Sequence, residues 1–367
     1  MNIKSKLYQQ FALEKIKEND FNQKVVNPLV VELDPTAACD LACPGCISED
    51  LVAVGNRFPN DRLLELGEEM IQFGVKAVIL IGGGEPLAHP KISQLIELLG
   101  ENDVHIGITT NGTFIHRHLE AIARHSKWTR ISFDAASERL FNVLRPAKRG
   151  KSKYEIIVNN MELLGKAKTG VMGFSFLIQT DRDGPGIETN ISEIFEAGKL
   201  AKEVGCDYFE VKPTYEFRGD IPHALMQHDQ DLMVLAKGEI AKLEELEDDT
   251  FSVIAAINLK YSLDGINEPQ PKTYSKCPST YLRTTITPSG AYVCPYWRGK
   301  ETMKIGDLLE SSFEEMWNSS QRKQVMDELD PSKDCRFHCL RHETNKTCFE
   351  ISNSKELFGL DEFDRFI

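Results

Sequence analysis

The sequence predicts an α/β protein: a partial (β/α)6 barrel, similar to a TIM barrel, followed by a small cysteine-rich C-terminal domain. Short apolar runs recur along the first two thirds of the chain with amphipathic helical segments between them, a pattern typical of a parallel sheet with right-handed crossovers. Six such units are too few for a closed eight-stranded barrel. After about residue 250 the sequence pattern changes to short turns rich in Cys and Pro, which indicates a second domain.

The apolar runs give the expected strands, which are residues 29–33, 77–81, 104–109, 130–133, 171–178 and 208–211. The expected helices are residues 62–73, 91–99, 114–125, 154–166 and 191–204, with a charged helix near 232–247. Gly74, Gly100 and Gly205 follow three of these segments, where glycine commonly ends a helix. The chain then divides into a helical or flexible leader (1–27), the barrel (28–250) and the C-terminal domain (251–367).

Composition excludes several classes of partner. The 367 residues carry a formal net charge of −13, whereas binding to nucleic acid or an anionic membrane calls for a surplus of Lys and Arg. No apolar stretch approaches the roughly 20 residues that span a bilayer, and the N-terminal region does not read as a secretion signal. We therefore expect a cytoplasmic protein. In that reducing compartment the nine cysteines are better read as metal ligands or catalytic groups than as disulfides.

The first cysteine group follows the first expected strand. Cys39, Cys43 and Cys46 have the spacing CxxxCxxC within a loop. Three thiolates can hold three irons of a four-iron, four-sulfur (4Fe-4S) cluster, and the fourth iron is then open to a small molecule. A zinc site is the alternative, but zinc would need a fourth Cys or His nearby, and the next candidate, His89, is distant in sequence. The spacing therefore favours the iron-sulfur cluster.

This cysteine triad, with Thr36 three residues before it, resembles the radical SAM superfamily. The resemblance implies that the open iron binds the methionine moiety of S-adenosylmethionine. One electron then splits the sulfonium into methionine and a 5′-deoxyadenosyl radical, so the cofactor carries the difficult chemistry. It also implies an electron donor of the flavodoxin or ferredoxin type. One position departs from the family: the residue before the third cysteine, usually aromatic or His, is Gly45, so the usual packing contact with the cofactor is not expected there.

Two further motifs resemble those of the family. The second strand ends in GGGEP (residues 82–86), similar to the family's GGEP motif. Gly83 and Gly84 would let the backbone approach the cofactor, and Glu85 would accept a hydrogen bond from the methionine ammonium. The third strand ends in a TNG sequence, in which Asn111 is either a cofactor contact or simply part of a polar turn.

The fourth strand offers a polar face. Strand alternation places Arg130, Ser132 and Asp134 on one side. The resemblance implies that Ser132 and Asp134 face the ribose of the cofactor. Arg145 is a weaker candidate, which is either a cofactor contact or a surface arginine paired with an acid.

The same alternation predicts a wet inner face. It groups Glu32 with Asp34 on the first strand, and Tyr208 with Glu210 and Lys212 on the sixth. Buried parallel strands are normally apolar, so alternate polar residues indicate a solvated cavity. Because the carboxylates outnumber Lys212, we expect an acidic site for a hydroxylated small molecule, with or without an amine, and with Glu210 and Lys212 as catalytic candidates.

The second cysteine group lies near the C-terminal end. A hairpin expected over 285–293 would bring its first two members together. The order of cysteines and glycine resembles the SPASM or shorter twitch extension of radical SAM enzymes, in which a full SPASM domain has seven cysteines for two clusters. The five cysteines here favour one auxiliary 4Fe-4S cluster, and the alternative is a zinc site completed by His338 or His342. The cluster ligands would be Cys277, Cys294, Cys335 and either Cys339 or Cys348.

Cys206 stands apart from both groups, just before the sixth strand. A lone cysteine is usually an inert core residue. The functional alternative is a hydrogen-atom donor that quenches a substrate radical, which would make the enzyme an epimerase.

We expect the enzyme to catalyse the dehydrogenation or epimerisation of a sugar, an aminocyclitol or a similar secondary metabolite. The single auxiliary cluster and the acidic inner face both favour this hypothesis. The alternative is a maturase that modifies a ribosomally synthesised peptide or protein, although the first 27 residues leave no room for a leader-recognition domain. A non-catalytic iron-sulfur carrier is disfavoured, because such a protein has no use for an open iron.

Overall fold

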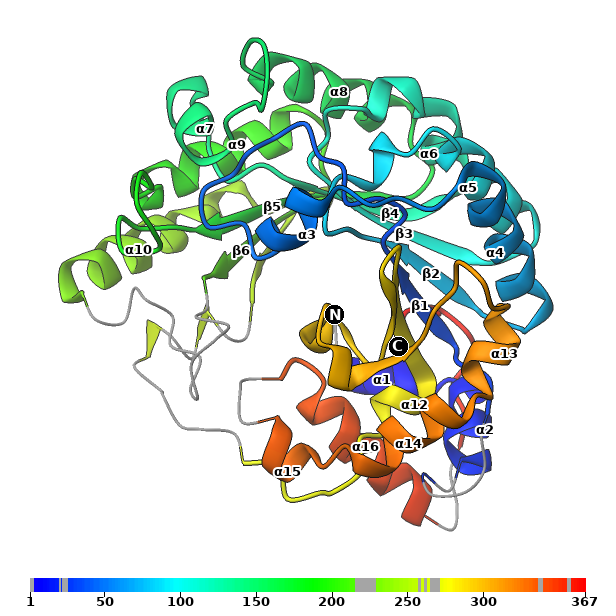
Figure 1. Ribbon diagram of the computed structural model, residues 1–367. Coiled ribbons are helices and arrows are strands. Elements are labelled where there is room, and N and C mark those ends of the chain that lie inside the picture. The colour runs from blue at the N-terminus through cyan, green and yellow to red at the C-terminus, as the bar shows by residue number, and fades with distance from the viewer. Residues whose placement is uncertain are drawn as a thin grey trace.

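A single curved sheet organises the chain (Figure 1). The computed structural model describes residues 3–19, 21, 26–214, 229–256, 259–260, 263–264, 271–335, 339–354 and 358–367. Within these residues the sheet has ten strands in the order β10-β9-β8-β1-β2-β3-β4-β5-β6-β7. The strands are β1 Val30–Leu33, β2 Ala77–Leu80, β3 His105–Thr110, β4 Ser126–Ser132, β5 Val171–Ile178, β6 Tyr208–Pro213, β7 Ser252–Ala255, β8 Arg283–Thr287, β9 Gly290–Tyr292 and β10 Lys304–Gly306.

The six expected strands are all present as β1 to β6, and each pairs in parallel with the next. Two differences have physical causes. Strand β4 begins at Ser126, four residues before the expected start, because Trp128 and Thr129 also pair with β5. Strand β7 was not predicted because it is an edge strand whose residues are mostly exposed, so it shows no buried apolar run.

Helices cover the convex side of the sheet (Figure 1). The five expected crossover helices are present as α4 Asn60–Gln72, α5 Ile92–Glu101, α6 Leu119–His125, α8 Tyr154–Ala167 and α9 Ile194–Glu203. The other helices of the barrel region are α3 Glu49–Val54, α7 Glu138–Leu144 and α10 Gln230–Lys242. The remaining helices are α1 Ile3–Leu7, α2 Gln10–Glu18, α12 Ser279–Leu282, α13 Phe313–Trp317, α14 Ser320–Glu328, α15 Pro331–Asp334 and α16 His342–Asn353.

The three glycines expected to end helices behave differently. Gly74 and Gly205 adopt φ angles of 84° and 83°, the left-handed conformation that commonly follows a helix. Gly100 instead lies inside α5, which continues to Glu101. A Cβ atom at Gly100 would lie 2.3 Å from the ring of His125, so this glycine permits close packing rather than helix termination.

The end of the barrel where the strands begin is covered by residues 358–367. The Gln9 side chain donates a hydrogen bond to the backbone carbonyl of Asp364 and accepts one from its backbone N–H. The ring of Phe366 packs near His105, the first residue of β3, with 6.2 Å between ring centroids. The opposite end of the barrel, where the strands finish, carries the cysteine loop that follows β1.

Strand β8 joins the cysteine-rich region to the barrel. It pairs in parallel with β1, and the register places Val30 beside Arg283 and Glu32 beside Thr285. The predicted hairpin is confirmed, because β8 and β9 are antiparallel neighbours that are joined by a short turn. The two predicted domains therefore share one continuous sheet.

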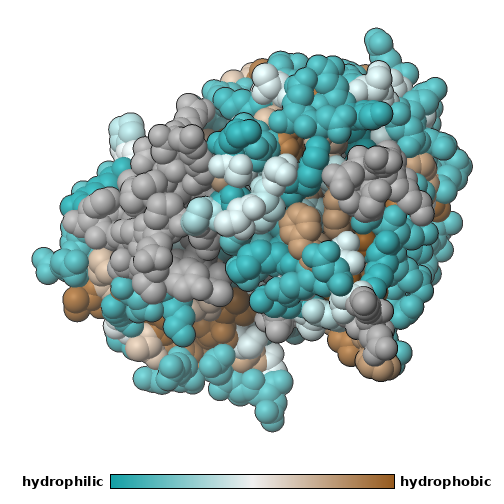
Figure 2. Space-filling model, turned by 90° about the horizontal axis from the view of Figure 1, so that it is seen from below, coloured by the Kyte–Doolittle hydropathy of each residue, from teal (hydrophilic) through white to brown (hydrophobic). Residues whose placement is uncertain are grey.

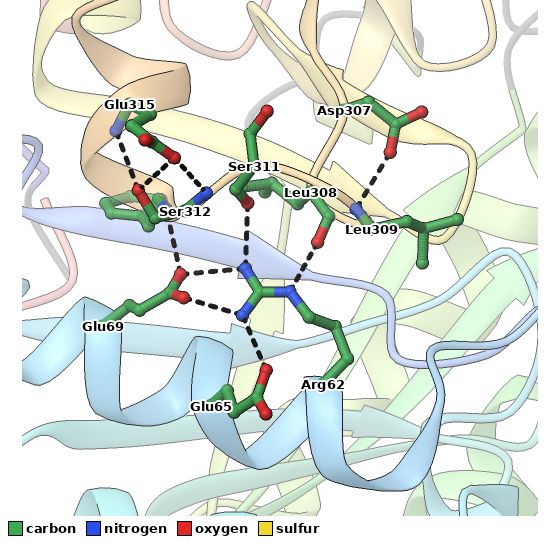
Figure 3. Close-up of polar contacts among 10 residues, drawn as sticks. Arg62, Glu65, Glu69, Asp307, Leu308, Leu309, Ser311, Ser312 and Glu315 are labelled. Carbon is green, nitrogen blue, oxygen red and sulfur yellow. Dashed lines mark hydrogen bonds and ion pairs between the residues drawn. The ribbon is translucent and has the colours of Figure 1, made fainter.

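Arg62 of α4 fixes the segment that leads from β10 to α13 (Figure 3). Its guanidinium donates to the backbone carbonyls of Leu308 (2.7 Å) and Ser311 (3.0 Å), and also to both carboxylate oxygens of Glu69. Glu69 in turn accepts a hydrogen bond from the backbone N–H of Phe313. One largely covered arginine therefore connects the barrel helix to the C-terminal region.

The surface agrees with the charged composition. Among the described residues no helix is long and apolar enough to cross a membrane. The face seen in Figure 2 is mainly hydrophilic, with small apolar patches.

The contacts of Arg62 give a stability prediction. Replacing Arg62 with Ala removes charge-assisted hydrogen bonds from a side chain that is 11% exposed, and we expect the free energy of unfolding to fall by about 1–3 kcal/mol. Denaturant unfolding measures this change. Glu65→Gln is the control, because Glu65 is 61% exposed and its loss should change stability by no more than about 0.5 kcal/mol. Equal stability of Arg62→Ala and the parent protein would contradict the assigned contacts.

Candidate functional site

The first cysteine group lies in the loop after β1, at the end of the barrel where the strands finish. Within this loop the backbone N–H of Cys46 donates to the carbonyl of Cys43 (3.3 Å). Gly45 has a φ of 67°, in the left-handed region that L side chains rarely adopt. The departure from the usual aromatic residue at this position therefore has a backbone cause.

Asp34 connects the cysteine loop to the GGGEP loop. Its Oδ2 accepts a hydrogen bond from the backbone N–H of Gly83 (2.6 Å), and its Oδ1 accepts one from that of Thr36 (3.2 Å). Burial raises the pKa of Asp34 to about 6. A Cβ atom at Gly84 would lie 2.3 Å from the carbonyl oxygen of Ala38. The glycines are therefore required for the close approach of these two loops.

Glu85 connects the GGGEP loop to the TNG turn. Its Oε1 accepts hydrogen bonds from the Leu87 backbone N–H (3.0 Å) and the Thr110 hydroxyl (2.6 Å). Its Oε2 accepts one from the Asn111 backbone N–H (2.6 Å). Burial raises the pKa of Glu85 to about 7. A carboxylate has about four acceptor sites, so one site on Oε2 is left for the predicted ammonium contact.

Asn111 is both a turn residue and a neighbour of the cysteine loop. Its Oδ1 accepts a hydrogen bond from the backbone N–H of Thr113 (2.9 Å), as in a polar turn. Its Nδ2 donates to Asp40 (3.0 Å) and to the sulfur of Cys39 (3.8 Å). The contact of Oδ1 fits the polar-turn interpretation of Asn111, and the cofactor contact stays a prediction.

Strand β4 supplies one wall of the site. Arg130 and Ser132 line the cavity as expected, together with Trp128. The expectation for Asp134 is wrong, because this residue has a φ of 62° and does not line the cavity. Its carboxylate instead accepts hydrogen bonds from Arg145 (2.8 and 2.5 Å). Asp134 therefore positions Arg145, which is itself a buried wall residue rather than a surface arginine.

Both cysteine groups line one cavity of about 870 Å³. Strand β8 supplies Thr285 and Arg283 to the wall of this cavity. The hydroxyl of Thr285 is buried without a hydrogen-bond partner among the described residues. Rim residues Ile47 and Leu340 are 71% and 54% exposed. The cavity-lining cysteines are Cys39, Cys43, Cys46, Cys277, Cys294, Cys335 and Cys339.

Comparison with known proteins identifies this arrangement. The family model for the radical SAM superfamily matches residues 33–185, and the model for the SPASM iron-sulfur cluster-binding domain matches residues 277–348. The chain belongs to the radical SAM superfamily. It also carries a C-terminal SPASM domain.

Relatives and solved structures agree with this assignment. The chain is 23% identical over 313 residues to mycofactocin maturase MftC of Mycolicibacterium smegmatis, covering 82% of this chain and 73% of that protein. It is 25% identical to the AdoMet-dependent heme synthase of Methanosarcina barkeri, over about half of each chain. The structure of Streptococcus suis SuiB bound to precursor peptide SuiA superposes with a TM-score of 0.60 at 15% identity, over 86% of this chain and 71% of that one. These structural likenesses support the fold.

The side chains around both cysteine groups fit iron-sulfur clusters. Family membership implies a SAM-binding 4Fe-4S cluster and, through the SPASM domain, auxiliary iron-sulfur ligation. N–H groups approach the sulfurs at both ends of the cavity: Asn111 at Cys39 (3.8 Å) and Asn345 at Cys277 (3.3 Å). Such hydrogen bonds help to set the reduction potentials of clusters.

The fourth auxiliary ligand is better supplied by Cys339 than by Cys348. Cys339 lines the cavity with the other three cysteines, whereas Cys348 is fully buried within α16 and does not line it. For the zinc alternative, His342 is hydrogen-bonded to the hydroxyl of Tyr274 (3.0 Å), and His338 lies outside the described residues. Among the described residues no three His, Cys, Asp or Glu side chains are grouped to hold a single metal ion.

The catalytic candidates on β6 form an ion-pair network with β4. Glu210 lies 3.1 Å from Lys212 and 3.2 Å from Arg130. Burial, and then the charge of Arg130, lower the pKa of Lys212 to about 8. Burial alone would raise the pKa of Glu210, but the charges of Lys212 and Arg130 outweigh it and hold that pKa below its ordinary value.

The prediction of an acidic inner face is wrong. The cavity wall holds Arg130, Arg145, Lys148, Arg283, Arg298 and Arg341 against Glu32, Asp34, Glu49 and Glu85. Alternation identified the acids on β1 and Arg130 on β4, but it did not include Arg283, because β8 was expected to be part of a hairpin and not a wall of the barrel. Arg145, Lys148, Arg298 and Arg341 lie outside the strands, where alternation does not apply. The polar alternation in Arg283 and Thr285 was the available indication.

The hydrogen-donor hypothesis for Cys206 does not fit the structure. Cys206 precedes β6, so it lies at the end of the barrel opposite the loop of Cys39, Cys43 and Cys46, and it is 5% exposed within the apolar core. Burial raises the pKa of its thiol well above the ordinary value. Cys206 is therefore a core residue.

Iron content tests the ligand assignment. We expect about eight irons per chain in the anaerobic parent enzyme, from two four-iron clusters. Cys339→Ala should retain about four irons because one ligand of the auxiliary cluster is lost, while the matched variant Cys348→Ala should retain about eight. The reverse outcome would assign the fourth ligand to Cys348, and about four irons in the parent enzyme would remove the auxiliary cluster.

Lys212 provides a pH prediction. Because folding lowers its pKa from 10.5 to about 8, the folded chain binds fewer protons than the unfolded chain between those values, and Lys212 makes stability rise with pH in that window. Its ion pair with Glu210 is lost as the pH rises through about 8. Competitive acetylation with mass spectrometry should give half-protonation of Lys212 near this pH. Lys199, whose hydrogen bond with Glu196 raises its pKa, is the control, and titration of Lys212 at its ordinary pKa would refute the assigned environment.

Proposed function

We propose that this radical SAM enzyme modifies a peptide or protein substrate, as a maturase does. The observation that carries the proposal is the similarity to mycofactocin maturase MftC, which extends over 82% of the chain and so includes the cysteine-rich region as well as the barrel. A solved structure with the same fold, SuiB, contains a precursor peptide. The AdoMet-dependent heme synthase and the GTP 3′,8-cyclases match only half of the chain or less.

The cavity supports a peptide better than a sugar. Its rim presents the apolar side chains of Ile47 and Leu340 to solvent, and such contacts suit the side chains of a peptide. The acidic face that favoured a sugar or an aminocyclitol is replaced by a wall in which basic residues outnumber acids. The small-molecule hypothesis therefore loses its main structural argument.

Different residues of the chain have different roles in this proposal. Cys39, Cys43 and Cys46 would hold the cluster that, when bound, supplies the electron for cleavage of S-adenosylmethionine. Asp34 and Glu85 keep the loops beside the cofactor in contact through buried hydrogen bonds. The substrate would enter between the two cysteine groups, where the walls exclude bulk water from a reactive radical.

Product analysis tests the proposal. We expect short peptides encoded beside this gene, incubated with anaerobically reduced enzyme and S-adenosylmethionine, to stimulate 5′-deoxyadenosine formation and to change in mass. Liquid chromatography with mass spectrometry measures both products. Cys43→Ala is the control and should form neither, because the first cluster loses a ligand.

Two other outcomes would contradict the proposal in different ways. Turnover of a sugar or an aminocyclitol, with every such peptide left unmodified, would restore the small-molecule hypothesis. Incubation of the enzyme with that substrate in deuterated water would then distinguish epimerisation from dehydrogenation. Solvent deuterium at carbon without oxidation indicates an epimerase, whereas an oxidised product without deuterium indicates a dehydrogenase.

A further inference from the structure

The wall formed by β1 and β8 holds more positive charge than it neutralises. Glu32 of β1 pairs with the Nη2 atom of Arg283, and the Nη2 atom of Arg341 lies 4.0 Å from the same carboxylate oxygen. All three side chains line the cavity. Arg283 also donates its Nη1 atom to the backbone carbonyl of Ile367 (2.7 Å), so both of its Nη atoms are engaged. In the described part of the chain, the guanidinium of Arg341 is therefore the one left with only a partner at 4.0 Å.

A buried hydroxyl beside these charges also lacks a partner. Thr285 is 2% exposed, lies opposite Glu32 in the β1–β8 register and lines the same cavity. Its Oγ1 atom has no hydrogen-bond partner among the described residues. Buried polar groups in folded proteins are nearly always hydrogen-bonded, so this hydroxyl indicates a place for a ligand atom.

We propose that Arg341 and Thr285, beside the already paired Arg283, form a binding site for a carboxylate of the peptide substrate. A guanidinium group binds a carboxylate through two parallel hydrogen bonds, and the Arg341 side chain is 27% exposed, so it can be reached from the cavity. The site adjoins the second cysteine group, since Cys277, Cys294 and Cys339 line the same cavity. This inference rests on the proposed peptide substrate.

Two sources could supply the carboxylate: the C-terminal carboxyl group of the peptide or an Asp or Glu side chain within it. Four blocked tripeptides separate these sources. N-acetyl-Ala-Ala-Ala is compared with its C-terminal amide, and N-acetyl-Ala-Glu-Ala amide is compared with N-acetyl-Ala-Gln-Ala amide. Isothermal titration calorimetry on the cluster-loaded enzyme measures each dissociation constant. The enzyme is first saturated with S-adenosylmethionine, so that binding of the cofactor's own carboxylate does not change during the titration.

We expect the acid of at least one pair to bind about 10- to 100-fold more tightly than its neutral counterpart, as loss of a charge-assisted hydrogen bond at a buried site predicts. The preference should disappear in Arg341→Gln and be retained in part by Arg341→Lys, which keeps the charge but not the paired hydrogen bonds. Iron content and the absorbance spectrum show whether each variant keeps its clusters.

Arg298→Gln is the matched control. Arg298 is another arginine of the same cavity, but its Nη2 atom donates to the hydroxyl of Ser48 (2.5 Å). We expect this variant to keep the preference for the acid. Equal loss in both variants would show a general effect of positive charge and would overturn the site.

The site is also overturned if the parent enzyme binds acid and amide equally, if it binds none of the four tripeptides, or if Arg341→Gln keeps the preference. Failure of this inference is distinct from failure of the proposed function. If the carboxylate site is wrong but the proposed function is right, peptides are still modified. If the proposed function is wrong, the preference for the acid persists but no peptide is modified.

Discussion

The parallel pairing of β8 with β1 is the interaction on which the site depends. Four successive residue pairs join the two strands, which places the strand after Cys277 directly beside the strand before Cys39. The two cysteine groups are far apart in sequence, yet this register opens both onto one cavity. Arg62 and Glu69 of α4 connect the barrel to the C-terminal region at a second place, the segment that leads into α13. Without the pairing of β8 with β1, the two cysteine groups would lie in separate parts of the chain and would not share a substrate cavity.

The same pairing determines the charge of the chamber. Strand β8 contributes Arg283, and Arg341 approaches the same wall from the loop before α16. Glu32 of β1 is consequently occupied by an arginine and not by a substrate amine. An enzyme whose overall charge is −13 therefore has a chamber wall in which basic residues outnumber acids. This local reversal, together with the apolar rim, makes a peptide with a carboxylate a better match than an aminated sugar.

Features that depend on the period of the apolar residues or on the spacing of cysteines could be predicted from the sequence. The strands β1 to β6 and the role of the Cys39 loop could be predicted because each depends on a local pattern. Asp134 could not, since its left-handed backbone breaks the alternation on which the prediction relied. The position of Cys206 before the sixth strand already indicated the end of the barrel away from the Cys39 loop, and its burial in the apolar core agrees with the inert alternative. The place of Arg283 in the wall could not be predicted, because it depends on a pairing between strands about 250 residues apart. The loop residues Arg298 and Arg341 could not be placed either, because no periodic pattern fixes the position of a loop side chain.

The pairing of β8 with β1 has a direct spectroscopic consequence. If both cysteine groups open onto one cavity, the two reduced clusters lie close enough for their electron spins to interact. Electron paramagnetic resonance of the fully reduced parent enzyme should then give a spectrum broadened by spin coupling, unlike the sum of the spectra of Cys43→Ala and Cys339→Ala. A parent spectrum equal to that sum would contradict the shared chamber and with it the central claim.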